Sequence, residues 1–215
     1  MKLNKLFLSL ILSVATVFIY AQEKLTFSIQ GGVNYSSLRF EDDRITDHDS
    51  EVGYLFGMSS NFYLGKKLYL DIEVNYERKK VSVYVSKIFI NSVSFGGDFR
   101  NFDIYEFITL PVMLRCEIGE INSFYVKGGP FLGYLLTAKE KINDGDLSQN
   151  LSEYFTDFDF GFSIGIGKIF SLDSSNKLML ELRNNIGLTN INNDPRSQYT
   201  KTNSLNFIVA WNFVL

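Results

Sequence analysis

Cysteine, histidine and long apolar runs are all scarce in this sequence. The single cysteine, Cys116, cannot form an intrachain disulfide, which excludes the class of small secreted domains held together by such bridges. The single histidine, His48, stands in an acidic segment with no second histidine to share a metal ion or a catalytic role. No nucleotide-binding motif is present. We therefore expect no enzyme, catalytic residue, cofactor or metal centre, although weak cation binding around His48 stays open.

Only one apolar run is long, and it stands at the start of the chain. Lys2 and Lys5 precede an apolar stretch at 6–20, and a small residue, Ala21, follows it. This pattern is typical of a secretory signal peptide. The alternative is a transmembrane anchor, but the run is shorter than the ~20 residues that a spanning helix needs. We expect a signal peptide at 1–21, cleaved after Ala21, and one exported domain at 22–215.

Net charge and mean hydropathy further limit the classes of protein to which this chain can belong. Without Lys2 and Lys5, 19 basic residues face 24 acidic ones, a net charge of about −5 that argues against a nucleic-acid partner. The mean hydropathy of +0.01 would by itself indicate a soluble protein. The order of the residues along the chain indicates something else.

Apolar side chains occupy every second position in eight segments. In 158–167 the even positions are all Phe or Ile, and the odd positions are Asp, Gly or Ser. Because successive side chains of a β-strand point to opposite faces, each such segment is a strand with one apolar and one polar face. The eight segments are 25–36, 52–65, 68–77, 107–119, 124–136, 158–167, 178–188 and 205–215.

The connections between these segments alternate in length. Long polar connections at 38–51, 87–103, 141–155 and 192–202 alternate with tight turns at 65–67, 119–123 and 171–176. Outer-membrane barrels have an even number of strands, short periplasmic turns and longer outer loops. The sequence therefore predicts an all-β fold, an eight-stranded antiparallel up-and-down transmembrane β-barrel. Pro111 and Pro130 would each interrupt strand pairing, since proline lacks the backbone donor.

The polar faces favour this barrel over a soluble sandwich. A sandwich would expose dispersed Lys, Glu and Thr, whereas these faces are rich in Gly and Ser, which suit the narrow interior of eight strands. The inward glycines are at 53, 57, 129, 133, 161, 165, 167 and 187. The expected interior charge network comprises Asp71, Glu73, Glu77, Arg115, Glu117, Lys127, Asp159, Glu181 and Arg183. Among these we expect Arg115 to pair with a carboxylate on 68–77, Glu73 first.

The segments 107–119, 124–141, 157–170 and 180–191 also resemble a known family in order and spacing. The motifs are a strand with Leu-Pro, "GPFLGYLL" and "ELRNNIGLTNI", and they are similar to those of the PorT-like outer-membrane β-barrel family common in Bacteroidetes. The resemblance covers essentially the whole chain after the leader. It implies an outer-membrane location, insertion by the barrel-assembly machinery and, through the founding member, an association with protein secretion.

For function, the leading interpretation is a non-enzymatic envelope protein. Its long outer loops would contact a protein partner, in a structural, surface-interaction or secretion-accessory role, while outer-membrane lipid surrounds the barrel. The strand at 68–77 continues into 78–99 well beyond the ~10 residues that a tilted membrane strand needs, so a hairpin should project above the bilayer. Two alternatives are a small pore or ligand channel, which a filled interior disfavours, and a soluble lipocalin-like binder, which would bury its apolar residues.

Overall fold

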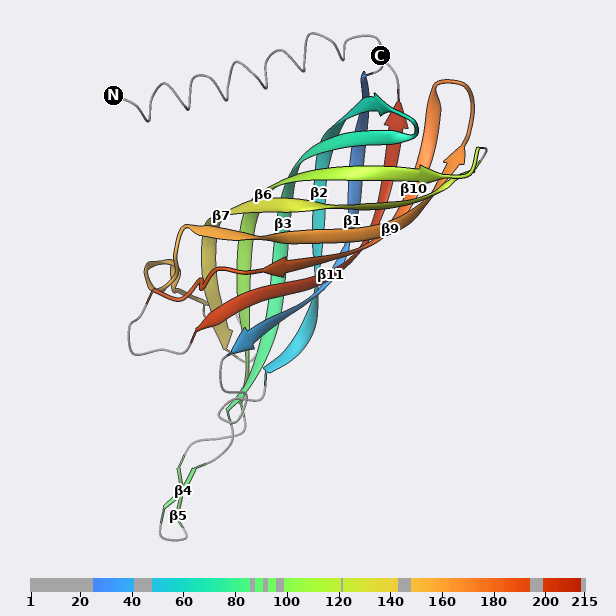
Figure 1. Cartoon of the computed structure of the whole chain (residues 1–215). Coiled ribbons are helices and arrows are strands. Elements are labelled where there is room, and N and C mark those ends of the chain that lie inside the picture. Colours follow the sequence, from blue (N-terminus) through green and yellow to red (C-terminus); the bar gives the residue numbers. More distant parts are fainter. Residues whose placement is uncertain are drawn as a thin grey trace, which may run out of the picture.

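The structure is a computed structural model that describes residues 25–40, 48–85, 88–90, 93–95, 99–120, 122–142, 148–193 and 199–213. The expected signal peptide lies outside these residues. Within them, eight long strands close into one antiparallel barrel, which confirms the predicted fold class (Figure 1). None of the described residues forms a helix that is long and apolar enough to cross a membrane.

Each barrel strand pairs with its neighbours in the chain, and the first strand pairs with the last. The ring runs β6, β3, β2, β1, β11, β10, β9, β7 and back to β6. The strands are β1 Leu25–Phe40, β2 His48–Gly65, β3 Leu68–Val85, β6 Phe99–Ile118, β7 Phe124–Ile142, β9 Phe158–Ser171, β10 Asn176–Gly187 and β11 Thr200–Phe213. Outside the ring lie β4 Ile88–Ile90, β5 Val93–Phe95, β8 Ser148–Asn150 and a 3₁₀ turn, η2, at Ser152–Tyr154.

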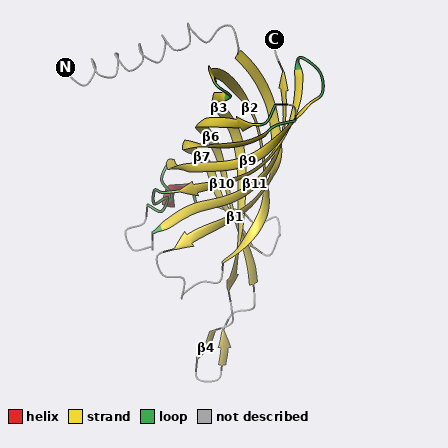
Figure 2. Cartoon of the chain, turned by 45° about the vertical axis from the view of Figure 1, so that its right-hand side comes forward, coloured by secondary structure: helices red, strands yellow, loops and turns green. Residues whose placement is uncertain are grey.

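Six strands extend further toward the long-loop end than the alternation predicts, and β3, β6 and β7 extend the most. β3 and β6 remain paired up to Val85 and Phe99, β2 accompanies β3 as far as His48, and β8 pairs with the end of β7. β9 and β10, in contrast, reach only Phe158 and Gly187 at this end. A sheet of β2, β3, β6, β7 and β8 therefore extends past one side of the barrel at its long-loop end, which is the lower end in Figures 1 and 2. β4 and β5 lie beyond this sheet. We call this sheet the lip. The expected projecting hairpin is confirmed. The connections after β1 and β3 are shorter than predicted, whereas the one after β10, at 188–199, is not.

The register of the strands sets the tilt of the barrel. Following paired residues once round the ring, from Leu68 through Cys116, Val126, Ile166, Leu182, Phe207, Val33 and Tyr54, returns to β3 at Arg78, ten residues further along. With strands about 4.8 Å apart and about 3.3 Å per residue, a stagger of ten over eight strands gives a tilt of roughly 40°. This tilt lies in the range of outer-membrane barrels.

The two faces of each strand meet different surroundings. In β9, Ile164 is 55% exposed, while its neighbours Ser163 and Gly165 are buried inside the ring. The other strands repeat the pattern, with exposed Val33, Met58 and Trp211 among the outward residues. Large apolar side chains thus face outward and polar ones inward, the reverse of a soluble lipocalin-like binder. In the segment 158–167, the Phe and Ile face is the lipid-facing one.

Two local features follow directly from residue type. At the β2–β3 turn, Gly65, Lys66 and Lys67 all have positive φ, of 105°, 50° and 64°, so the turn is left-handed throughout and a glycine begins it. At both prolines the ladder is interrupted without a register shift, because Pro111 has no partner on β3 and Pro130 none on β6. The expected interruption of strand pairing at these prolines is confirmed.

Candidate functional site

The interior of the barrel holds the concentration of charge that the sequence predicts, and it has two unlike sides. Strands β3, β6, β7 and β10 carry most of the charged side chains and β9 carries Asp159, whereas β1 and β11 carry amides and hydroxyls. The amide and hydroxyl side comprises Ser28, Gln30, Asn34, Ser36, Thr202, Ser204, Asn206 and Asn212, all buried. The amides can therefore help to solvate the charges across the lumen.

The centre of the charged side is a cluster of two carboxylates and two cations. Arg183 on β10 donates to both oxygens of Glu73, at 2.8 and 2.9 Å, and from its Nε to Glu181 at 2.5 Å. Lys127 lies between the same carboxylates, with Nζ at 2.9 Å from Glu73 and 2.7 Å from Glu181. Because β3 and β10 stand opposite each other in the ring, Arg183 connects two facing walls.

Neutral donors complete the coordination of these carboxylates. Gln30 Nε2 and Asn75 Nδ2 donate to Glu73 Oε2 at 2.7 and 3.1 Å, and the Tyr125 hydroxyl donates to Glu181 Oε2 at 2.8 Å. Every carboxylate oxygen of Glu73 and Glu181 thus has a partner. Buried ions need this degree of satisfaction, since their desolvation costs several kcal/mol per ion.

A second ion-pair group lies toward the turn end. Arg115 on β6 donates from Nε to Asp71 Oδ2 at 2.9 Å and from a terminal nitrogen to Asp71 Oδ1 at 3.3 Å, and it also pairs with Glu117. The expected pairing of Arg115 with Glu73 is wrong. The register places Arg115 opposite Tyr69, one diagonal step from Asp71, while Glu73 lies further along β3 and is occupied by Lys127 and Arg183.

The remaining predicted residues lie nearer the long-loop end and apart from the central cluster. Glu77 is 3.7 Å from Lys79 Nζ and accepts hydrogen bonds from Thr109 and Asn185 at 3.0 and 3.2 Å. Asp159 accepts from Thr202 at 2.5 Å and from Thr189 at 3.2 Å. All nine predicted residues therefore point into the barrel. Seven of them form one connected set, because Lys127 Nζ also lies 3.9 Å from Asp71 Oδ2, whereas Glu77 and Asp159 lie apart from it.

Glycines on β9 provide the space for the central cluster. Gly165 is paired with Lys127 on β7 and with Arg183 on β10, so it lies between these two side chains. A Cβ at Gly165 would come within 3.0 Å of Glu181 Oε1. Gly167 lies between Tyr125 and Glu181 in the same way, and a Cβ there would come within 2.4 Å of the Tyr125 ring. The alternating glycines of 158–167 thus accommodate large side chains from both neighbouring strands.

Apolar side chains close the interior above and below the charges. Toward the turn end, Tyr125 packs with Ile169, Met179 and Ala210. Toward the long-loop end, Tyr105, Phe107, Leu135 and Ala138 form a second cluster, against which Leu38 and Phe155 pack. Within the described residues, buried side chains therefore occupy the lumen at three levels, with the ion pairs in the middle and an apolar cluster on either side of them.

Sequence reasoning missed several inward side chains of this site. Lys79 and Tyr125 both contact the predicted charges, and each follows the same alternation as its neighbours Glu77 and Lys127. Continuing the period by two residues would have identified Lys79 and Tyr125. Among the described residues, no group of three or more His, Cys, Asp or Glu side chains could hold a metal ion. The acidic segment before His48, at 41–47, lies outside those residues.

The comparisons with known proteins agree with this geometry. Residues 20–193 match the family described as outer membrane protein beta-barrel domain. The chain belongs to this family. As a member of the outer membrane protein beta-barrel domain family, it is an outer-membrane protein of the cell envelope, and lipid surrounds its outward apolar face. No curated protein matches the sequence.

Several solved structures of outer-membrane proteins are distantly similar. Neisserial surface protein A is 14% identical, with a TM-score of 0.45, covering 86% of this chain and 95% of that one. The attachment invasion locus protein Ail of Yersinia pestis, solved with the heparin analogue sucrose octasulfate, is 14% identical, with a TM-score of 0.41 and coverage of 88% and 99%. A major outer membrane protein of Thermus thermophilus is 11% identical, with a TM-score of 0.48 and coverage of 88% and 99%.

Proposed function

We propose that this protein is a non-enzymatic, closed outer-membrane barrel that presents the lip to a protein partner outside the cell, in a surface-interaction, structural or secretion-accessory role. Within this proposal, residues 1–21 are a cleaved signal peptide, 22–215 form the barrel domain, and the barrel-assembly machinery inserts it. The motifs resembling the PorT-like family of Bacteroidetes favour the secretion-accessory form of the role.

The observation that carries the proposal is the contrast between the lumen and the lip. The lumen is filled by ion pairs between two apolar clusters, so transport through it is disfavoured. The lip, in contrast, continues the sheet above the barrel and ends in a short strand, β8, which pairs on one side with β7. A strand at a sheet edge offers unpaired backbone groups to an extended segment of a partner.

Crosslinking in intact cells tests this proposal. A photo-crosslinking amino acid at Gln149, an exposed residue of β8, should form one discrete adduct with another protein. The matched control is Ser174, an exposed residue of the opposite, periplasmic turn, which should form no such adduct. A protein adduct from Ser174 and none from Gln149 would place the partner on the periplasmic side and overturn the proposal.

A further inference from the structure

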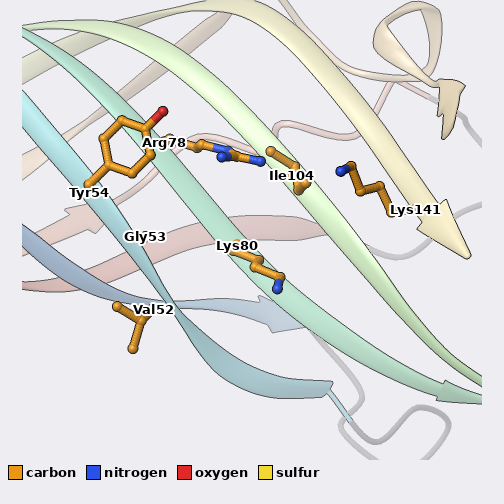
Figure 3. Close-up of a pocket in the computed structure, with 7 residues that line it drawn as sticks. All are labelled: Val52, Gly53, Tyr54, Arg78, Lys80, Ile104 and Lys141. Carbon is orange, nitrogen blue, oxygen red and sulfur yellow. The ribbon is translucent and has the colours of Figure 1, made fainter. Parts of the chain in front are cut away.

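A basic pocket opens on the outward surface where the barrel meets the lip. It has a volume of about 210 Å³ and is lined by Val52, Gly53, Tyr54, Arg78, Lys80, Ile104 and Lys141. Figure 3 shows the Arg78 guanidinium and the Lys141 ammonium directed toward Ile104 from either side, from β3 and β7. Three cations from two strands therefore surround one apolar floor.

These cations are only partly neutralised. Arg78 has one acidic neighbour, Glu106, whose Oε1 lies 3.9 Å from Nε. Lys80 Nζ lies 3.7 Å from the centre of the Phe102 ring. Within the described parts of the chain, neither Lys80 nor Lys141 has a carboxylate partner. The pocket thus carries a surplus of about two positive charges and attracts an anion with at least that charge.

The position of the pocket relative to the membrane identifies the kind of anion. Arg78 is the eleventh residue of β3 counted from the turn end, and 9–11 residues carry a tilted strand across the hydrocarbon core. Tyr54, directly opposite Arg78, belongs to the outward aromatic residues at this boundary, and Tyr76 lies 6.2 Å from it between ring centres. The pocket therefore lies at headgroup level and faces the lipid.

The long-loop end of such barrels is the extracellular one, so the headgroups at this level belong to the outer leaflet. We infer that the pocket binds the phosphorylated headgroup of the outer-leaflet glycolipid. The Arg78 fork suits phosphate oxygens, the two lysines add charge, and the exposed Val52 side chain contacts the adjoining apolar part of the lipid. Basic pockets at a membrane surface recognise anionic headgroups in this way, at about five-fold in affinity per Lys or Arg.

Titration of the purified full chain in phosphatidylcholine nanodiscs, followed by native mass spectrometry, tests the inference. The three probes are diphosphorylated lipid A, the same lipid without its phosphates, and inorganic phosphate alone. The diphosphorylated lipid should bind at least ten-fold more tightly than either other probe. Equal binding of the two lipids would overturn the inference, and equal binding of inorganic phosphate would assign the pocket to a free anion instead. These comparisons use the unaltered chain and do not depend on a variant folding.

A matched pair of variants locates the site. Lys141→Gln should weaken binding of the diphosphorylated lipid about five-fold. Lys168→Gln removes the same charge from β9 near the turn end, far from the pocket, and should change binding less than two-fold. Arg78→Lys keeps the charge but loses the fork, and should also weaken binding. If Lys168→Gln matched Lys141→Gln, diffuse charge rather than the pocket would be responsible.

Discussion

Arg183 is the side chain whose removal should damage the barrel most, because it connects facing walls through two carboxylates. In Arg183→Met the side-chain volume is largely kept, but Glu73 and Glu181 lose three donor contacts of 2.5 to 2.9 Å. Lys127 is then the one cation left for both. Breaking a buried pair by removing one partner costs about 3–5 kcal/mol, so the free energy of unfolding should fall by that amount.

Neutralising a carboxylate should recover part of this loss. The double variant Arg183→Met, Glu73→Gln removes the uncompensated charge, and the one oxygen of the new amide can still accept from Lys127. Lys66→Met, in the exposed β2–β3 turn, is the matched control and should stay within about 0.5 kcal/mol of the unaltered chain. Together the three variants separate the loss of a buried ion pair from the loss of a positive charge.

The assay is urea unfolding in lipid vesicles, monitored by fluorescence of Trp211, the single tryptophan, whose side chain lies on the outward face. A loss below about 1 kcal/mol in Arg183→Met would refute the reasoning, because a buried ion pair cannot be removed that cheaply. So would a double variant no more stable than the single one.

Three further outcomes follow from the geometry. Ile164→Arg, on the lipid face near mid-membrane, should lower the free energy of unfolding by about 2–4 kcal/mol in vesicles, and normal insertion would contradict the assigned facing. Gly167→Ala should lower the urea midpoint more than Gly165→Ala, since its Cβ would come within 2.4 Å of the Tyr125 ring against 3.0 Å from a movable carboxylate; the reverse order would contradict the packing. In the lip, burial and the nearby Glu140 carboxylate raise the pKa of Asp103 from 3.8 to about 6. The protonated carboxyl therefore stabilises the fold fully at low pH, and this contribution is lost as the pH rises from about 4 to 6. The protection factors of the β6 amides above the membrane, in which the intrinsic base-catalysed exchange rate is divided out, should fall over that range. Asp103→Asn should remove this dependence, and an unchanged profile would exclude Asp103 as its source.

The strands, and which of their side chains point outward, could be predicted because the membrane imposes the same constraint on every residue of a membrane-spanning strand. Lipid outside and a narrow polar lumen inside enforce strict alternation, which Ile164 and Gly165 display as clearly as any pair. Above the membrane this constraint ends. In β3 the residues after Glu77 no longer alternate simply, since Val81 and Ser82 are both buried, and alternation alone therefore predicts loops over part of the lip.

The partners within the lumen could be predicted only in kind. Alternation shows that Arg115 points inward. Whether it pairs with Asp71 or with Glu73, two residues further along β3, depends on the exact register between β3 and β6, which alternation does not give. The contact between Arg183 and Glu73 depends on the closure of the ring, since it joins residues 110 positions apart. The basic pocket could not be predicted from alternation, because its cations come from strands whose outer ends lie beyond the apolar pattern.

The central claim is that the lumen is filled and closed, and single-channel recording in planar lipid bilayers tests it most directly. The purified, refolded chain should show no discrete conductance steps at voltages where open barrels of similar size conduct. Arg183→Met should remain equally silent, since the apolar clusters around Tyr125 and Phe107 still close both ends of the lumen. Stable single-channel steps in the unaltered chain, with a size that changes in Arg183→Met, would instead make the charged cluster the lining of a pore.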